Sequence, residues 1–414
     1  MKIIKMAWHN MWRNWRRTLI ASIAIILGMI LLIFMDALIK GSDQAIYGNA
    51  VRMYGGNVQV HAPGYREKSD RLPLLPLADS ETVVETIEAM DSPEKILATS
   101  KRINTGGMVS TGAGNYPVTI TAIEPEKEAP VSLFAENISN GRFLTSQDGD
   151  NIVIGQGLAD LLEADVGDRI MVVGQRLNES MRQRPMTIVG IYNLGMDSAE
   201  RNTVFINLPI AQTLYNLRDQ ETEVVISLEK IGKESEVIAE LQTQLPDYEI
   251  DSWDTLSPEI QQTLQSKAAA TSILGMLVVL IASIGILNLM LMAVYERTRE
   301  MGVLAAMGMK GHQISILFLL EGTFIGLFAA VVGAIAGGLL VAIVGQSGIP
   351  IGDLTQSAGN VELYALIGER MYPVMAIGNT ISYVILVTII AAAASFYPAW
   401  QASRREPAEA LHHI

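Results

Sequence analysis

The chain has 414 residues, of which 50% are hydrophobic and only 18% are charged, so it is more apolar than an ordinary soluble globular protein. Its formal net charge of −13 argues against a nucleic-acid-binding surface, because phosphate recognition requires clustered cations. It contains no cysteine, which excludes disulfides, thiolate metal sites and cysteine nucleophiles. Something other than water therefore solvates part of this protein.

Four apolar segments are each long enough to cross a bilayer, which takes about 20 helical residues. They cover residues 18–40, 268–295, 314–344 and 374–400. Residues 41–267, between the first and second segments, have the composition of a soluble domain. We therefore predict an α-helical membrane protein with four transmembrane helices and a large mixed α/β extracytoplasmic domain inserted between helices 1 and 2.

Residues 1–17 are predicted to form an amphipathic helix in the headgroup region. Ile4, Trp8, Trp12 and Trp15 recur at helical spacing beside five cations. A secretory signal peptide is the alternative, since cations precede an apolar run. The run is longer than that of a signal peptide and no clear small-residue cleavage site follows it directly, which favours a membrane helix.

The distribution of charge predicts the orientation, because cationic loops stay in the cytoplasm. Residues 1–17, the loop 296–313 and the tail 401–414 together carry ten cations and four acids. Residues 41–267 carry 18 Lys and Arg against 34 Asp and Glu. We expect a bacterial inner-membrane protein with both termini in the cytoplasm, and with the acidic domain and the loop 345–373 on the periplasmic side.

The soluble stretch predicts a mixed domain. Runs rich in Val, Ile and Thr predict strands over residues 57–61, 117–123, 169–173, 186–192, 203–206 and 222–228. Apolar positions at helical spacing predict helices over residues 80–90, 157–163, 209–217 and 233–245. The proline-containing residues 62–78 are expected to form a linker or mobile loop.

No motif in the chain specifies catalysis. Gly155, Gly157 and Asp160 are similar to part of a phosphate-binding glycine loop, but the full spacing is missing and a strand-to-helix turn is the better interpretation. There is no Walker A sequence and no HExxH helix, and the five histidines are scattered or terminal. We therefore predict no catalytic, metal or cofactor site within this chain.

Small residues recur at every fourth position of the third apolar segment. They are Gly322, Gly326, Ala330, Ala334, Gly338 and Ala342. Small residues at this spacing let two helix backbones approach closely in lipid. Contact with another helix of the same chain is favoured over a homodimer interface.

Polar residues inside apolar segments are costly in lipid and need partners. The candidates are Asp36, Asn288, Glu321 and Asn379. A proton or ion relay would need such groups at similar depth, whereas Asp36 and Glu321 fall near opposite ends of their segments. A structural role is favoured for Glu321, with Arg297 or Arg299 as its partner.

The loop after the second segment combines a charged first turn with a small apolar knob on a short helix. Its residues of interest are Glu296, Arg297, Thr298, Arg299, Glu300, Met301, Gly302, Val303, Leu304, Met307 and Gly308. An exposed apolar knob on the cytoplasmic face indicates a protein partner. The alternative is an amphipathic helix resting on lipid.

This loop, ERTREMGVLAAMGMKGHQI, resembles the ERTREIG-type segment of the FtsX-like family of ABC transporter permeases, with Met301 where isoleucine is commoner. The closing YPAWQASRREPAEAL resembles the family's PAxxASxxxPxEAL pattern, and Glu321 falls where a glutamate is usual. Residues 55–65, GGNVQVHAPGY, resemble a stretch of lipoprotein-releasing permeases of the LolC/LolE type. The layout is also similar to that of MacB-type exporters, which carry a fused ATPase.

The resemblance implies a permease subunit of the mechanotransmission type, without a nucleotide site of its own. A separate ABC ATPase dimer would hold ATP and Mg²⁺, and the loop helix would dock on it. The other implied partners are a second permease chain, identical or different, membrane lipid, and a periplasmic lipoprotein chaperone or adaptor. The implied activity is release of lipoproteins or lipids from the outer leaflet of the inner membrane. The acyl-chain contacts expected on this basis are Met35, Leu38, Ile273, Met276 and Leu277.

Two alternatives stay open at this point. One is MacB-like export of a peptide, toxin or drug from the periplasm through an adaptor. The other is a signalling permease that controls a cell-wall hydrolase without transporting a substrate. The large external domain argues against the second alternative, because such relays resemble proteins with much smaller external domains.

Overall fold

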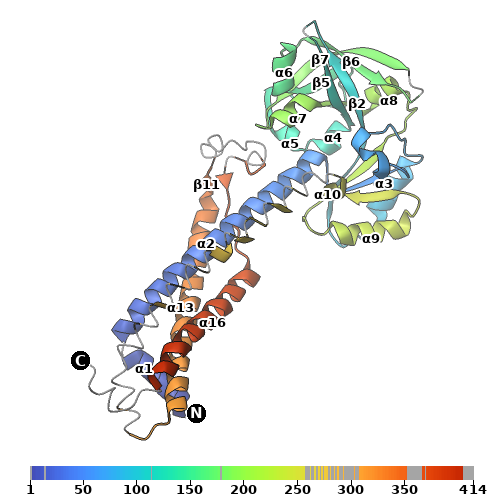
Figure 1. Ribbon diagram of the computed structural model, residues 1–414. Coiled ribbons are helices and arrows are strands. Elements are labelled where there is room, and N and C mark those ends of the chain that lie inside the picture. The colour runs from blue at the N-terminus through green and yellow to red at the C-terminus, as the bar shows by residue number, and fades with distance from the viewer. Residues whose placement is uncertain are drawn as a thin grey trace. The chain divides into compact units, whose positions relative to one another are not determined.

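The computed structural model describes residues 2–13, 15–112, 114–177, 180–256, 307–351, 366–368 and 370–403, with scattered positions between 262 and 303. The chain divides into two compact units (Figure 1). The helical unit comprises residues 1–43, 265–350 and 370–414, and the α/β unit comprises residues 44–264 and 351–369.

Long apolar helices make up the helical unit. They are α1 (Lys2–Arg13), the first part of α2 (Trp15–Tyr54), α13 (Gly311–Ser347) and α16 (Ile377–Ser403), with a short ladder of β11 (Ile349–Pro350) and β12 (Arg370–Met371). Among the described residues, three stretches are long and apolar enough to cross a membrane: Ser22–Met53, Gly311–Ser347 and Ile377–Phe396. Most of the predicted span 268–295 lies outside the described residues, and the described positions in it are helical.

Helix α2 is longer than the span predicted over residues 18–40. It continues to Tyr54, well into the α/β unit. Residues after Gly41 are too polar for a hydropathy signal, yet Ile46, Ala50 and Val51 keep a buried helical face there. Hydropathy alone therefore underestimates this helix, whereas its periodicity does not.

One part of the α/β unit is an antiparallel sheet covered by helices. Its strand order is β10 (Glu249–Ser252), β1 (Val58–His61), β9 (Glu223–Leu228) and the first half of β2 (Ile96–Ser110). Helices α3 (Ser80–Ala89) and α9 (Glu234–Gln244) bury their apolar faces on it. Val237 and Leu241 of α9, one turn apart, are completely buried in this core.

The other part of the α/β unit is a closed ring of strands. In order around the ring they are the second half of β2, β3 (Asn115–Ile123), β8 (Thr203–Asn207), β5 (Asn151–Gly155), β7 (Met181–Tyr192) and β6 (Arg169–Gln175), which pairs again with β2. Strand β4 (Ile138–Gly141) pairs with β7 outside the ring. Helices α6 (Gln156–Leu162) and α8 (Leu208–Tyr215) supply apolar side chains to the ring's core. Gly107 lets the ring close, because a Cβ there would meet the Ile120 side chain and, at 2.9 Å, the carbonyl oxygen of Val173.

Short helices complete the α/β unit. They are the 3-10 helix η1 (Arg66–Arg71), α4 (Pro125–Glu128), α5 (Leu133–Glu136), α7 (Asp197–Asn202) and α10 (Trp253–Leu256). Helices α4 and α5 follow β3 in turn, so the chain leaves the ring at Ile123 and returns to it at β5.

The six predicted strands and four predicted helices all coincide with observed elements of the same type. The glycine turn is also confirmed, because β5 ends at Gly155 and α6 begins at Gln156. Strand β2 was missed, since Ser100, Lys101 and Arg102 interrupt its apolar pattern. These polar residues are tolerated there because the structure supplies partners for them: Ser100 and Arg102 bond to Glu128, and Lys101 bonds to Glu81.

The expectation that residues 62–78 form a linker or mobile loop is wrong for much of that segment. It contains η1, and the buried ring of Tyr65 stacks on His61 with centroids 3.7 Å apart. Arg66 donates to both carboxylate oxygens of Asp251, at 3.0 and 3.2 Å from its Nε. The Leu77 side chain is 1% exposed. Partners distant in the sequence anchor the segment, and its polar composition does not reveal them.

A tight turn after β4 provides a test of the α/β unit's electrostatics. The guanidinium of Arg142, with bonds from Thr145 and Asn151, holds the pKa of Asp148 well below its usual range. The folded state therefore binds a proton less readily than the unfolded state. The Asp148 carboxylate therefore stabilises the folded state fully above the ordinary aspartate pKa. This stabilisation is lost as the pH falls below that value toward the lowered pKa of the folded state.

We predict that Asp148→Asn lowers the free energy of unfolding by about 1–3 kcal/mol near neutral pH, where the charged hydrogen bonds are lost. Thermal unfolding of the full chain in detergent, between about pH 6 and about pH 3, measures this. The difference between wild type and variant should shrink on acidification. The control is Asp150→Asn, because the Asp150 side chain is 49% exposed, against 6% for Asp148. A constant difference across this pH range contradicts the prediction.

Candidate functional site

Each of the three long helices of the helical unit carries a row of exposed apolar side chains at every fourth residue. On α2 the row is Leu19, Ile23, Leu27, Leu31 and Met35; on α13 it is Leu327, Val331, Ile335, Leu339 and Ile343; on α16 it is Ile377, Ile381, Ile385 and Ile389. Exposed fractions run from 38% at Met35 to 71% at Ile377. Continuous apolar rows of this length are costly in water and favourable in lipid. Such rows are typical of surfaces that face hydrocarbon.

Helix α13 packs closely against both other long helices through glycine. A Cβ at Gly322 or Gly326 would overlap Ser395 or Ala391 of α16. A Cβ at Gly333 would lie 2.7 Å from the Cβ of Met29 in α2, and Gly337 faces Ile30 and Ile33 of the same helix. Figure 1 shows the three helices running side by side. Backbones approach this closely in lipid only where side chains are absent.

The small-residue stripe expected from the sequence is thus distributed over several contacts. Ala330 is completely buried and Ala334 packs against the same core, while Gly338 lies against the Met375 side chain. The glycines that contact α2, Gly333 and Gly337, were missed because they fall outside the four-residue repeat. Two overlapping repeats along one helix would have indicated two neighbours.

A polar cluster joins α2 to α16. The Asp36 carboxylate accepts a hydrogen bond from Asn379 Nδ2 and another from the Tyr383 hydroxyl, both at 2.9 Å. Close by, the backbone amide of Val374 donates to the Ala37 carbonyl at 2.9 Å. Asp36 and Asn379 were candidates from the sequence, and Tyr383 was missed. In lipid these bonds stabilise one arrangement of the two helices, because an unpaired carboxylate would be costly there.

The other end of α2 is held within the α/β unit. Arg52, in its last turn, donates to the Val131 carbonyl at 3.2 Å and pairs with Glu136 at 2.6 Å. Directly after the helix, Gly55 adopts φ +90° and lies against the guanidinium of Arg102, where any Cβ would overlap it. Arg102 is 7% exposed and forms a two-pronged ion pair with the buried Glu128 of α4. We name these residues, Arg52, Gly55, Arg102, Glu128 and Glu136, the α2 anchor.

The anchor's energetics follow from its burial. Removing one member of a buried ion pair leaves an uncompensated charge, whereas removing both is often tolerated. The pair therefore fixes where α2 meets the domain, although it contributes little net stability as a pair. The role of the ion pair is therefore to position these segments and not to add stability.

The remaining predicted residues fall in different environments. Ile273, Met276 and Leu277 are exposed, at 62%, 72% and 49%, and Leu38 is half-buried. Asn288 is exposed and Glu321 is 3% exposed. In the loop, Val303 and Met307 are exposed and Gly308 has φ +91°. Glu296, Arg297, Thr298, Arg299, Glu300, Met301, Gly302 and Leu304 lie outside the described residues.

No group of three or more metal-ligating side chains occurs within the described part of the chain. The candidate site consists of the apolar rows, a polar cluster between two long apolar helices, and one helix anchored in an α/β unit. This combination is typical of an integral membrane protein.

Family models agree with this class. The model of the MacB-like periplasmic core domain matches residues 18–244, and the FtsX-like permease C-terminal model matches residues 272–407. The first match covers more than half of the chain. The chain belongs to the family of ABC transporter permeases that carry a MacB-like periplasmic core domain.

Individual relatives come from two kinds of ABC system. The lipoprotein-releasing system transmembrane protein LolC of Xylella fastidiosa is 24% identical over 404 residues, covering 94% of this chain and 92% of that protein. The macrolide export ATP-binding/permease protein MacB of Hyphomonas neptunium is 24% identical over 369 residues, covering 84% of this chain and 54% of that protein. The solved periplasmic region of MacB from Actinobacillus actinomycetemcomitans gives a TM-score of 0.34 at 14% identity, over 51% of this chain and 94% of that one.

The close contact of α13 with α16 predicts that Gly326→Val destabilises the protein by about 1–3 kcal/mol, because the added atoms overpack the contact with Ala391. The matched control is Gly378→Val on α16, where a Cβ meets nothing within 4 Å. Thermal unfolding in one detergent compares the two variants. Equal melting temperatures for both would show that the glycine contact is not required.

The α2 anchor predicts strong coupling between Arg102 and Glu128. Arg102→Met and Glu128→Leu should each cost about 3–5 kcal/mol of unfolding free energy, since each leaves a buried charge unpaired. The double variant should lose much less than the sum of the two. A double-mutant cycle measured by chemical denaturation tests this, and additive losses would contradict the buried pair.

Proposed function

We propose that the chain is the transmembrane subunit of a mechanotransmission ABC transporter that extracts lipoproteins or lipids from the outer leaflet of the bacterial inner membrane. Both termini would lie in the cytoplasm and the α/β unit in the periplasm. The large movement in such a system is a change in the position of helices, rather than the opening of a pore.

The observation that carries the mechanical part of this proposal is the continuity of α2. Its exposed apolar row ends at Met35, its polar cluster lies at Asp36, and its last turn is held by Arg52. A helix keeps its own backbone hydrogen bonds, so it can transmit displacement without losing any. A movement at the membrane end of α2 would therefore reach the α/β unit.

The substrate part rests on two supports. The similarity to LolC extends over nearly the whole of both proteins. The apolar side chains of Met35, Ile273 and Met276 are exposed and chemically suited to acyl chains. We propose that these residues, with Leu38 and Leu277, contact the acyl chains of the substrate.

ATP hydrolysis would be supplied by a separate ABC ATPase dimer, which holds ATP and Mg²⁺. We propose that the helix in the loop 296–313 docks on it. Val303 and Met307, 45% and 72% exposed, supply apolar contact area at that end. A second permease chain would complete the transporter, and a periplasmic lipoprotein chaperone would receive the product.

MacB-like export is the second candidate function. It is favoured by the match of the MacB-like periplasmic core domain model over residues 18–244. In that case a periplasmic adaptor would replace the chaperone, and the substrate would be a peptide, toxin or drug. The two candidates share a mechanism and differ in substrate.

The experiment is reconstitution of the chain with its ATPase in phospholipid nanodiscs. A triacylated lipopeptide should raise ATP hydrolysis and leave the disc in an ATP-dependent manner, whereas the same peptide without acyl chains should do neither. Stimulation by a macrolide but not by the lipopeptide would support export instead and refute extraction.

Variants of the loop separate coupling from substrate binding. Val303→Glu and Met307→Glu should abolish stimulation while lipopeptide binding persists, because a charge is introduced where apolar contact is proposed. Val166→Glu, at an exposed position of the α/β unit, is the matched control. Undiminished stimulation in both loop variants would refute docking at this helix.

A further inference from the structure

The first half of β2 has an unpaired edge. Pairing with β9 covers residues 96–102, whereas pairing with β3 begins at Ile103 and pairing with β6 begins at Gly107. Strand β3 ends at Ile123, and the chain then continues into α4. Among the residues that the structure describes, no strand therefore lies beside residues 96–99 on the side opposite β9.

The outward peptide groups can be assigned from neighbouring bonds. The Ile226 carbonyl accepts from the Asn57 amide at 2.8 Å, so Ile226 turns its peptide groups toward β1. Thr99 is opposite Ile226, and in an antiparallel ladder its own amide and carbonyl then point away from β9. Lys101 lies two residues after Thr99, so its peptide groups point to the same side of the strand. Its amide donates outward to the Glu124 carboxylate at 3.0 Å. Two independent bonds thus give the same direction for Thr99.

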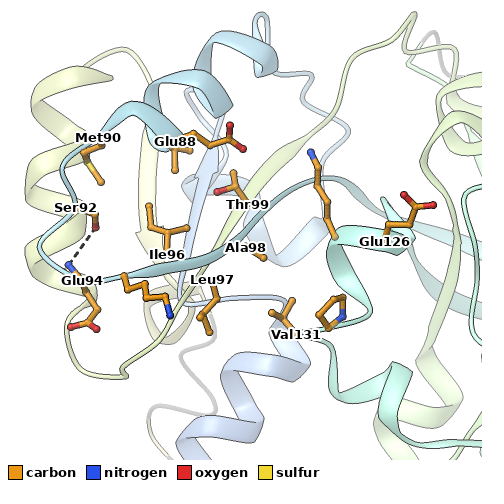
Figure 2. Close-up of a pocket in the computed structure, with 14 residues that line it drawn as sticks. Glu88, Met90, Ser92, Glu94, Ile96, Leu97, Ala98, Thr99, Glu126 and Val131 are labelled. Carbon is orange, nitrogen blue, oxygen red and sulfur yellow. Dashed lines mark hydrogen bonds between the residues drawn. The ribbon is translucent and has the colours of Figure 1, made fainter.

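This edge lines an open groove of about 630 Å³. The groove's other wall is formed by Lys127 of α4 and by Pro130 and Val131 of the connection to α5, and the end of α3 closes one side (Figure 2). A register shift between Ile96 and Ala98 takes Leu97 out of the ladder and leaves its side chain 51% exposed. Figure 2 shows Leu97 and Val131 on the same side of the strand.

A buried hydroxyl in the same groove lacks a hydrogen-bond partner in the described structure. Thr99 lines the groove and is 7% exposed, yet its Oγ1 has no partner. A buried polar atom without a partner costs about 1–3 kcal/mol. Groove occupancy by a polar backbone would remove that cost.

The chemistry of the groove specifies its occupant. The outward amide and carbonyl of Thr99 are complementary to another extended backbone. The exposed apolar area at Leu97, Pro130 and Val131 suits one apolar side chain of the guest. Both lysines of the groove are already paired, Lys95 with Glu229 at 3.4 Å and Lys127 with Glu124 at 3.2 Å.

The remaining groove charges favour basic flanks on the guest. Three carboxylates line it, those of Glu88, Glu94 and Glu126. Glu94 is paired with Lys230 at 3.3 Å, so Glu88 and Glu126 supply the negative charge that the described lysines do not compensate. A second copy of this chain is disfavoured, because the edge is walled by Pro130 and Val131 and a copy would bring its own wall. We propose that this groove binds an extended segment of a partner polypeptide, with an apolar centre and basic flanks, as an added strand along residues 96–99.

This inference goes beyond the proposed function and does not depend on the substrate. Its site nevertheless touches the α2 anchor, since Val131, which lines the groove, accepts the hydrogen bond from Arg52. A bound strand would therefore pack against the backbone that holds the last turn of α2.

The test uses the full chain in nanodiscs and a fluorescent eight-residue peptide that alternates threonine with valine or leucine and ends in lysine. Two versions carry N-methyl groups on alternate amides, so that each version blocks one edge of the peptide. We expect the parent to bind, one methylated version to lose about tenfold or more in affinity, and the other to bind like the parent. Absence of parent binding, or equal affinity of all three, would overturn the proposal.

Two variants at Thr99 test the protein's side of the contact. Thr99→Pro removes the outward amide and the side-chain hydroxyl, is tolerated at an edge position, and should weaken parent binding about tenfold or more. Thr99→Val keeps the amide and should bind within about threefold of wild type. Unchanged affinity in a folded Thr99→Pro variant contradicts the added strand.

Hydrogen exchange on the wild type avoids any dependence on the variants' folding. The Thr99 amide should exchange more slowly when the peptide is saturating, and an unchanged rate would overturn the proposal. The last measurement is the oligomeric state of the chain, determined from its mass in solution. Loss of self-association in Thr99→Pro, without an effect on peptide binding, would mean that a second copy occupies the edge.

Discussion

Helix α2 (Trp15–Tyr54) is the element that the two units share, and it is held at two places, near its middle in the helical unit and at its last turn in the α/β unit. In the helical unit, Gly333 and Gly337 of α13 let the backbones approach, and Asp36 holds α16 through two hydrogen bonds. In the α/β unit, the α2 anchor fixes its last turn. Between these two places the peptide groups of the helix hydrogen-bond to one another, because lipid offers them no hydrogen-bond partners.

The chemistry at these two places on α2 differs because the solvents differ. In lipid, association relies on close packing and on a few hydrogen bonds, and the exposed apolar rows need no cover from protein. In the α/β unit, buried charges need a partner, either an opposite charge, as for Arg102 and Glu128, or hydrogen-bond donors, as for Glu200.

Much of this architecture follows from the sequence. Apolar segments longer than a bilayer, the loop motif around Met301 and the strand patterns predicted the family and most elements of the α/β unit. What could not be predicted was set by partners distant in the chain. Strand β2 reads as polar until Glu128 is placed beside Ser100 and Arg102, and residues 62–78 read as a loop until Asp251 meets Arg66.

The candidate site was predicted unevenly for the same reason. Asp36 and Asn379 stand out in the sequence because polar groups are costly in lipid. Tyr383 does not stand out, because its largely apolar ring is common in membrane helices. The groove beside β2 leaves no sequence signal, because an unpaired strand edge is a property of topology and not of composition.

The central claim, that α2 transmits movement as one continuous helix, is tested most directly by breaking it at Ala45. The measurement is ATP-dependent release of a triacylated lipopeptide from nanodiscs by the permease with its ATPase, for wild type, Ala45→Pro and the control Ala45→Ser. Proline removes one backbone hydrogen bond and costs about 3 kcal/mol in a helix interior. The account predicts that Ala45→Pro still hydrolyses ATP but no longer releases the lipopeptide, whereas release at the wild-type rate would contradict it.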